Sequence, residues 1–457
     1  MFPAVAAGHP KTAAAGAELL ATGGSAADAA VGACLASCVA ETVMTGFLGG
    51  GHAIYWDAES RQGRNLDCFC AVPSGTGGDL LELDVQFGEE LVHYAVGPAS
   101  CAVPGVPAGL DALWREHGRL PWAEVCAPAL RLAREGVPMP EAHAACLAML
   151  EPVMTMREGA RMYAPTGRLL GPGEKLDQPG LVRALELVAE EGARSAYEGS
   201  IAETLLELMA DRGGVVTRTD LTSYRSVWSE PVEVPYAGTR FLTRAGLAPV
   251  GPALERLPAL RDLGEPERTL ALFHALDGAP DTSSHTTNLV TVDGAGSACV
   301  LTTSLGLGSG DWLPGLDLHL NSMLGEADLV VAPPEPGARM ESMMSPSVAL
   351  DGDRPVLAIG AAGGTRLRTA LVTTASAILD ENLSPQAAVD LPRIHRVGDV
   401  VNAEPGIDES ALTALESRGL TVRRWAGRHH YFGGVSVVAA AGAAADTRRS
   451  GTAIQPT

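Results

Sequence analysis

Apolar and polar positions along this chain follow helix-like and strand-like patterns in turn. Residues 11–22 and 180–192 predict helices, and each run is closed by glycine. Residues 26–38 are small and apolar almost throughout, which is typical of a helix buried on all sides. The apolar runs 289–292 and 434–440 predict strands. This mixture favours a layered α/β arrangement in which helices cover sheets.

Length and charge narrow the class of protein. The chain has 457 residues, enough to bury a sizeable core, and it carries 33 basic and 54 acidic residues for a net charge of −21. A chain this acidic is a poor candidate for binding nucleic acid or an anionic membrane surface. No apolar run has membrane-spanning length, and the first residues lack the basic and apolar regions of a signal peptide. We therefore expect a cytoplasmic protein.

The eight cysteines lie mostly in apolar runs, which predicts buried free thiols and no disulfide framework. Cys68 and Cys70 are too close together for a usual zinc pair, and no second pair completes a site. We therefore expect neither a metal nor another cofactor.

Short motifs follow one another in a fixed order over nearly the whole chain. They include Gly23-Gly24-Ser25-Ala26-Ala27-Asp28-Ala29-Ala30, Gly49-Gly50-Gly51, Val103-Pro104-Gly105, Gly363-Gly364-Thr365-Arg366 and Pro392-Arg393-Ile394-His395. In this order they resemble the γ-glutamyltranspeptidase family. The resemblance implies the four-layer αββα sandwich of N-terminal-nucleophile hydrolases. It also implies a precursor that is cut once into a large and a small subunit.

The resemblance places the cut before a threonine. The stretch 285–293 is similar to the family segment Thr-Thr-His-x-Ser-Val-Val-Asp, and alignment on Asp293 puts Thr286 at the nucleophile. Cleavage between His285 and Thr286 would give a large subunit, 1–285, and a small subunit, 286–457, that together form one αββα domain. The neighbouring Ser283 and Ser284 offer alternative hydroxyls, but this register disfavours them.

Chemistry explains why the nucleophile must become an N-terminus. A threonine hydroxyl is a weak nucleophile and needs a base nearby. After cleavage Thr286 would carry its own base, a free α-amino group that titrates near pH 8. The branched side chain also restricts where its hydroxyl can point.

Three further residues match the family's catalytic positions. Ser304 falls on a threonine whose hydroxyl supports the nucleophile, although a strand hydroxyl bonded locally would give the same sequence. Gly363 and Gly364 follow a predicted buried strand and open a helix, where backbone N–H groups suit an oxyanion hole. The resemblance assigns both glycines to that role.

The resemblance also assigns substrate binding to Asn321, Glu326 and Ser342. Glu326 falls where the family meets a substrate ammonium with a carboxylate, and a solvated acidic loop residue is the alternative. Ser342 keeps one of two family serines that bind the substrate's α-carboxylate.

Three positions depart from the family pattern. Phe69 stands where the family has the arginine that holds the α-carboxylate, Gly306 replaces an asparagine and Met343 replaces the second serine. A phenyl ring cannot replace the two-pronged contact between a guanidinium and a carboxylate.

We therefore carry three functional hypotheses. The first is an autoprocessed γ-glutamyltransferase or glutathione hydrolase that cleaves γ-glutamyl amides through a threonine acyl-enzyme. The second is an amidase or acylase of the same fold that acts on a non-glutamyl acyl group, which the three departures favour. The third is an uncleaved, inactive homologue that serves as a binding or structural subunit. The partners expected are a small-molecule amide and the two subunits, and a homo-oligomer is left open.

Overall fold

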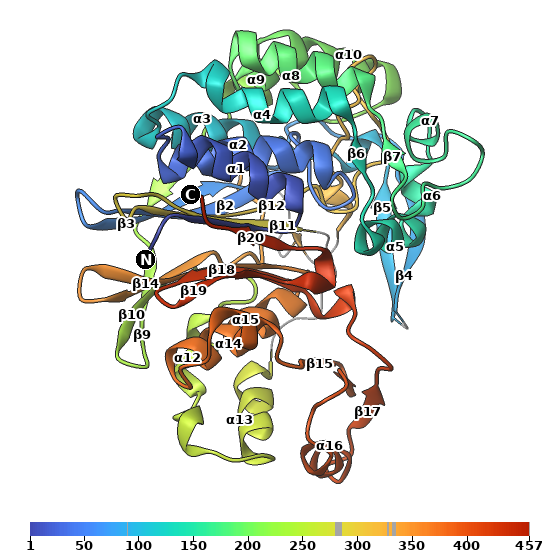
Figure 1. The fold of residues 1–457 in the computed structure, drawn as a ribbon. Helices are drawn as coiled ribbons and strands as arrows, with labels where there is room; N and C mark the ends of the chain where they lie inside the picture. The colour runs from blue at the N-terminus through green and yellow to red at the C-terminus, as the bar shows by residue number, and fades with distance from the viewer. Residues whose placement is uncertain (89, 279–285, 327–328, 331–334, 457) are drawn as a thin grey trace.

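Two β-sheets lie face to face at the centre of the molecule, and helices cover the outer face of each sheet (Figure 1). The structure is a computed structural model, and it describes residues 1–88, 90–278, 286–326, 329–330 and 335–456. The four layers confirm the predicted αββα sandwich.

All strand pairs in the two central sheets are antiparallel in the described part of the chain. The first sheet runs in the order β20 (Thr452–Ile454), β1 (Ala4–Ala7), β11 (Thr287–Val292), β12 (Ala298–Ser304), β2 (Gly50–Asp57), β3 (Gln62–Cys68) and β8 (Val227–Ser229). The second runs in the order β19 (Gly442–Ala445), β18 (Gly434–Ala439), β14 (Arg354–Ala362), β13 (Ser347–Asp351), β10 (Thr239–Thr243) and β9 (Val232–Tyr236).

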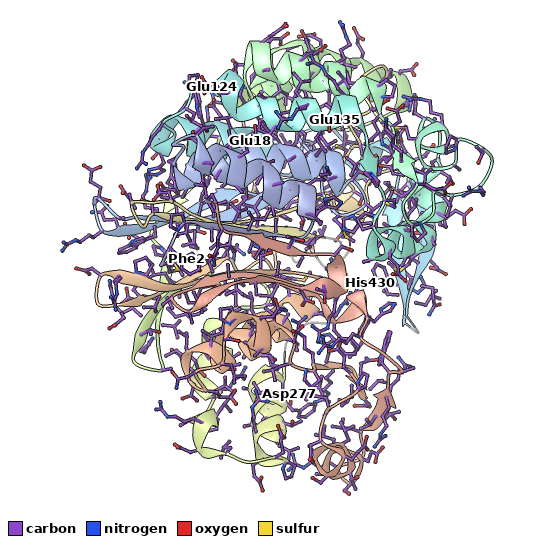
Figure 2. All side chains as sticks on the ribbon, viewed as in Figure 1. Phe2, Glu18, Glu124, Glu135, Asp277 and His430 are labelled. Atoms are coloured by element: carbon purple, nitrogen blue, oxygen red, sulfur yellow. The ribbon has the colours of Figure 1, made fainter. Side chains whose placement is uncertain are left out.

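The helical layers differ in size. The layer over the first sheet contains α1 (Pro10–Ala21), α2 (Ala26–Ala40), α3 (Val106–His117), α4 (Trp122–Glu135), α8 (Pro179–Glu191), α9 (Ser195–Glu198), α10 (Ser200–Arg212) and α11 (Arg218–Ser223). The layer over the second sheet contains α12 (Gly251–Arg256), α13 (Glu267–Leu276), α14 (Arg366–Leu379) and α15 (Pro385–Val389). Figure 2 shows Glu18, Glu124 and Glu135 on the first helical layer, and all three are exposed. Acidic side chains therefore lie on the solvent side of these helices.

Two smaller groups of elements flank the sandwich. One joins the hairpin of β4 (Leu81–Phe87) and β5 (Glu90–Val96) to α5 (Glu141–Met149), α6 (Glu151–Met154), α7 (Gly159–Tyr163), β6 (Val137–Pro138) and β7 (Lys175–Leu176). The other joins β15 (Ile394–Val397), β16 (Val400–Ala403) and β17 (Thr421–Arg424) to α16 (Glu409–Glu416).

Side-chain alternation along the strands builds two cores. In β11, Val290 and Val292 face the second sheet, where they join the inter-sheet cluster. Leu289 faces the helices, and the hydroxyl of Thr291 donates to the Ala26 carbonyl at 2.7 Å. Successive strand residues point to opposite faces. The second sheet covers one face of β11 and the helices cover the other, so the strand is buried on both sides. By this rule Thr287 also faces the helices.

The predicted all-apolar helix is α2, and every residue in it is buried. Ser25 caps its first turn together with Asp28 in a reciprocal capping box. The helix extends past the predicted end at residue 38 to Ala40, and Glu41 follows it directly. The helix thereby carries a buried carboxyl into the centre of the molecule.

Strands from both sides of residue 286 share both sheets. In the first sheet β11 lies between β1 and β12, and in the second β13 lies between β10 and β14. The proposed large and small subunits would therefore be interleaved within one folded unit.

All eight cysteines are buried and unpaired, as predicted. Across the residues that the structure defines, no helix is both long and apolar enough to cross a bilayer. No group of three or more His, Cys, Asp or Glu side chains in the same residues is arranged to hold a metal ion.

Candidate active site

Thr286 lies at the entrance to β11 and is 2% exposed. It is the first described residue after 279–285, so His285 lies outside the described residues. The backbone carbonyl of Thr286 accepts a hydrogen bond from Arg449 Nη1 at 3.3 Å. β11, which begins at the next residue, Thr287, is hydrogen-bonded to a strand on each side.

Thr286 faces a cavity that we call the nucleophile cavity. The described residues that line it are Phe69, Thr286, Ser304, Met323, Leu329, Ser342, Met343, Met344, Gly364 and Leu367. Four predicted site residues, Thr286, Ser304, Ser342 and Gly364, are thus brought together from four separate segments of the chain. Their catalytic and binding roles stay predictions.

Strand register explains how Ser304 reaches the nucleophile. Thr287 in β11 pairs with Thr303 in β12, so Ser304 continues β12 to the level of Thr286. The Ser304 hydroxyl accepts a hydrogen bond from the Gly306 N–H at 2.8 Å. Ser304 is 1% exposed.

Gly363 and Gly364 form the turn between β14 and α14. Their φ angles are +127° and +59°, in the region that favours glycine. A Cβ atom on Gly363 would stand 2.8 Å from the Cα of Gly433, so the close approach also requires glycine. Gly364 lines the nucleophile cavity and Gly363 does not. The turn places the N-terminal amides of α14 beside Thr286, where an oxyanion could be bound.

The three predicted substrate-binding residues occupy different places. Ser342 lines the nucleophile cavity, and its hydroxyl accepts from the Met344 N–H at 3.2 Å. Asn321 does not line the cavity, because its amide binds the backbone of Leu48 and Ala102 at 2.9 Å. Its side chain therefore joins two backbone segments, and its role in substrate binding stays a prediction.

Glu326 also lies outside the lining of the nucleophile cavity. It is 4% exposed, and its carboxyl fills the space beside Gly306. A Cβ atom on Gly306 would stand 2.1 Å from the Glu326 carboxyl. A side chain at position 306 would therefore clash with the Glu326 carboxyl in this arrangement.

Nearby arginines do not replace the one missing at Phe69. Arg339 donates to the Phe69 carbonyl at 2.9 Å and pairs with Asp67 at 3.3 Å. Arg244 donates to the Ser342 carbonyl at 3.1 Å. Neither lines the nucleophile cavity, and none of the described residues that line it is charged. Phe69 and Met343, two of the departures from the family, belong instead to an apolar cluster on its wall.

A second cavity lies against Thr286, and we call it the Glu41 cavity. Its described lining includes Glu41, His143, Thr286, Thr287 and Arg449. The Thr287 hydroxyl donates to Glu41 Oε2, and the Thr12 hydroxyl donates to Oε1 at 2.6 Å.

Burial raises the pKa of Glu41 to about 7, and the hydrogen bonds from Thr12 and Thr287 oppose this only in part. Burial also lowers the pKa of Arg449. A carboxyl and a guanidinium are therefore both held in an apolar interior beside the nucleophile. The sequence did not point to either residue as part of the site, and only Glu41 had a usable signal, since it is a charged residue that directly follows an all-apolar helix.

The two-sheet sandwich, with a threonine at the head of a central strand, defines the class of N-terminal-nucleophile hydrolases. The chain belongs to the gamma-glutamyltranspeptidase family, because the family model matches residues 12–262 and 255–455. The predicted family is confirmed.

Relatives named as acylases and relatives named as glutathione hydrolases both match most of this chain. The chain is 28% identical over 491 residues to Acylase ACY 1 proenzyme of Pseudomonas sp. (strain V22), covering 91% of this chain and 86% of the relative. It is 24% identical over 500 residues to the Glutathione hydrolase proenzyme of Bacillus subtilis (strain 168), covering 91% and 84%. The structure of cephalosporin acylase from Bacillus halodurans superposes with a TM-score of 0.82, at 24% identity, over 99% of this chain and 95% of that one. This superposition supports the fold.

Proposed function

We propose that the protein is an amidohydrolase that removes an apolar acyl group from an amide through a covalent ester with Thr286. The lining of the nucleophile cavity carries this proposal, since most of it is apolar and none of its described side chains is charged. A glutamyl group would bring a carboxylate and an ammonium into this space. Burying charges without partners costs several kcal/mol.

The reaction follows from the groups around Thr286. After cleavage the α-amino group of Thr286 takes the hydroxyl proton while Oγ1 bonds to the acyl carbon. The backbone N–H of Gly364 donates to the resulting oxyanion. The carbon–nitrogen bond then breaks, the amine takes the proton and leaves, and an ester remains. Water attacks this ester, releasing a carboxylic acid and restoring the hydroxyl.

Cleavage between His285 and Thr286 is part of the proposal. Relatives named as proenzymes support it, and so does the position of Thr286 at the head of β11. The sheet would hold the new N-terminus in place after the cut.

A denaturing gel tests the cleavage. We expect wild type to give two bands, corresponding to residues 1–285 and 286–457, while Thr286→Ala stays full length. Thr286→Ser, which keeps a hydroxyl, is the matched control and should still be cut. Normal cleavage of Thr286→Ala would overturn the assignment of the nucleophile. A wild-type chain that stays intact would support the third hypothesis, an uncleaved binding subunit.

The preference between two substrates tests which acyl group the enzyme removes. We compare hexanoyl-4-nitroanilide with γ-glutamyl-4-nitroanilide, which share one leaving group. We expect kcat/KM to be higher for the hexanoyl substrate by about a hundredfold, because the charged head finds no described partner in the cavity. A preference for the γ-glutamyl substrate would contradict the proposal.

The second candidate function is γ-glutamyl hydrolysis or transfer. The glutathione hydrolase relatives favour it, and so does Ser342, a matched family serine that lines the nucleophile cavity. The same pair of anilides decides between the two candidates.

A further inference from the structure

A short turn after α2 holds the two strands that lead to the proposed nucleophile. α2 ends at Ala40, and the chain continues through a turn in which the Thr45 N–H donates to the Glu41 carbonyl at 3.0 Å. Glu41 and Thr45 are each 1% exposed. We call residues 41–45 the α2 turn.

The α2 turn forms one side-chain contact with each of the two strands. Glu41 Oε2 accepts a hydrogen bond from the hydroxyl of Thr287 in β11. The Thr45 hydroxyl lies 2.7 Å from the hydroxyl of Thr303 in β12 and is hydrogen-bonded to it. Because Thr287 and Thr303 are themselves a cross-strand pair, both contacts are made at one level of the sheet.

The hydroxyls of the proposed nucleophile and of its predicted partner come next in these strands. Thr286 directly precedes Thr287, and Ser304 directly follows Thr303. Continued by one position, the antiparallel register places Thr286 opposite Ser304. Residues opposite each other in such a pair have Cα atoms about 4.5 to 5.5 Å apart. The α2 turn therefore acts on the pair adjacent to the nucleophile.

Glu41 has little freedom to move. Its other oxygen, Oε1, accepts from the Thr12 hydroxyl at 2.6 Å. Gly8 lies against the contact with the strand, since a Cβ atom there would stand 2.6 Å from Glu41 Oε2 and 2.9 Å from the Thr287 hydroxyl oxygen. The carboxyl is thus hydrogen-bonded through both oxygens and enclosed by the neighbouring chain.

Arg449 joins the same group of residues. Its Nη1 donates to the Thr286 carbonyl at 3.3 Å and lies 3.7 Å from the sulfur of Met44 in the α2 turn. The peptide unit between Thr286 and Thr287 is therefore held at its carbonyl by Arg449 and at the following side chain by Glu41.

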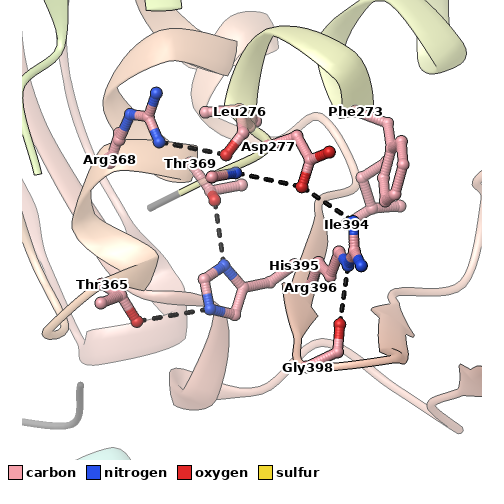
Figure 3. A pocket seen from close by; sticks show the side chains of 11 residues that line it. Phe273, Leu276, Asp277, Thr365, Arg368, Thr369, Ile394, His395, Arg396 and Gly398 are labelled. Carbon is pink, nitrogen blue, oxygen red and sulfur yellow. Dashed lines mark hydrogen bonds and ion pairs between the residues drawn. The ribbon is translucent and has the colours of Figure 1, made fainter. Parts of the chain in front are cut away.

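A different set of contacts supports the opposite side of the site. Figure 3 shows that His395, in β15, lies 3.4 Å from the Thr365 hydroxyl and 3.1 Å from the Thr369 hydroxyl, both at the start of α14. These contacts hold the turn that carries Gly364. The α2 turn provides the corresponding support for β11 and β12.

We propose that Glu41 and Thr45 are positioning residues, which hold the nucleophile at the distance from Ser304 that its reaction requires. Each acts through the threonine that it binds. The inference rests on the proposed function, in which Thr286 is the nucleophile. A displacement of about 1 Å at a reacting group can cost about a hundredfold in rate, so small shifts of these strands matter.

The acylation rate of Thr286 tests the inference. With cut enzyme in excess over 4-nitrophenyl acetate, release of 4-nitrophenol measures transfer of the acetyl group to the Thr286 hydroxyl, and Thr286→Ala gives the background. Raising the enzyme concentration yields a limiting rate constant and a half-saturating concentration. The small acetyl group makes the test independent of which acyl group the enzyme naturally removes.

Three variants each remove one of the contacts. We expect Thr287→Val and Thr45→Val, which keep the branched shape, to lower the limiting rate constant about tenfold, and Glu41→Ala to lower it about a hundredfold. The half-saturating concentration should not change. A loss of folded protein would instead raise the apparent half-saturating concentration and leave the limiting rate constant as it is. The rate of cleavage before Thr286, followed on a denaturing gel, should show the same order of variants.

Glu41→Gln separates position from charge. Its amide oxygen can accept from the Thr287 hydroxyl, so the limiting rate constant should return to within about threefold of wild type. The double variant Glu41→Ala/Thr287→Val should be no slower than Glu41→Ala alone, because both changes remove the same hydrogen bond. Thr12→Val is the matched control at the other oxygen of Glu41 and should stay within about twofold of wild type.

Two results would overturn the inference alone. One is a limiting rate constant in Glu41→Gln as low as in Glu41→Ala, because the charge of the carboxylate would then matter in place of its position. The other is a wild-type rate in both Thr287→Val and Thr45→Val. A wild-type chain no faster than Thr286→Ala would overturn the proposed function and this inference with it.

Discussion

At the scale of single residues, Glu41 links the helical layer to the nucleophile. It is 1% exposed, and two threonine hydroxyls bind its carboxyl, one of them from Thr287 beside the nucleophile. Its pKa rises from an ordinary value of 4.5 to about 7. The folded protein therefore keeps this proton over a pH range in which the unfolded chain has released it.

This difference predicts how stability depends on pH. Because the folded state binds the extra proton, the free energy of unfolding should fall as pH rises from about 4.5 to 7, by about 3 kcal/mol. Glu41→Gln removes this contribution, so the variant should gain stability relative to its parent between pH 5 and pH 8. Urea unfolding in the uncut Thr286→Ala background at these two pH values measures the gain.

The control is Glu18→Gln, which changes an exposed glutamate on the neighbouring helix α1. It should leave the difference between the two pH values as it is in the parent. Parallel pH profiles for the parent and Glu41→Gln would show that Glu41 titrates normally in the folded protein.

The meeting of residues at one cavity was predictable where they sit in short, ordered motifs. Thr286, Ser304 and Gly364 lie within a few residues of such motifs, and the structure brings them to one cavity. The contacts of Asn321 could not be predicted, because the sequence does not show that its amide binds the backbone of a distant loop. Glu41 was missed because its carboxyl reaches Thr287 across 246 positions of the chain.

At the scale of elements, Asp28 ties α2 to the segment that joins α3 and α4. Its carboxylate accepts from the backbone of Ser25 at 2.9 Å, Arg119 at 2.8 Å and Leu120 at 3.2 Å. One side chain therefore satisfies the start of a buried helix and a loop 91 positions away.

Removal of the Asp28 carboxylate should lower the free energy of unfolding more than removal of the Ser25 hydroxyl does. Asp28→Ala leaves three backbone N–H groups without their acceptor, so we expect a loss of about 3 kcal/mol or more in the free energy of unfolding. Ser25→Ala removes only the hydroxyl that caps the helix and should cost about 1 kcal/mol. Urea unfolding of both variants provides the comparison, and equal losses would contradict the proposed link between elements.

Strong local patterns predicted elements well. The helices near 11–22, 26–38 and 180–192 all occur, because their apolar spacing and their glycine or serine boundaries act locally. The small sheet β15–β17 was not predicted. Its strands have four residues each, and β16 pairs with β17 only after α16 has intervened. Pairing of this kind depends on tertiary packing, which short strands do not encode.

At the scale of the whole molecule, the two-sheet architecture came from the family resemblance rather than from any single pattern. Alternation predicts that β11 is a strand, but not that it lies between β1 and β12. The apolar contacts that hold the sheets together join strands from distant parts of the chain, such as β1, β2, β12, β13 and β18. Their pairing is set by the combined burial of both sheet faces.

This interleaving predicts the behaviour of the cleaved protein. Residues 1–285 supply β1, β2 and β10, while residues 286–457 supply the strands that pair with them. Separation would expose the inter-sheet core and break antiparallel ladders in both sheets, so cleavage of one peptide bond should not release either segment. On a native size-exclusion column we expect the two segments to co-elute, with a mass of 47.1 kDa or a multiple of it. They should separate only in denaturant, and the uncut Thr286→Ala variant should elute at the same native volume. Elution of the small segment alone from the native column would mean that the strands on either side of residue 286 do not share their sheets in solution.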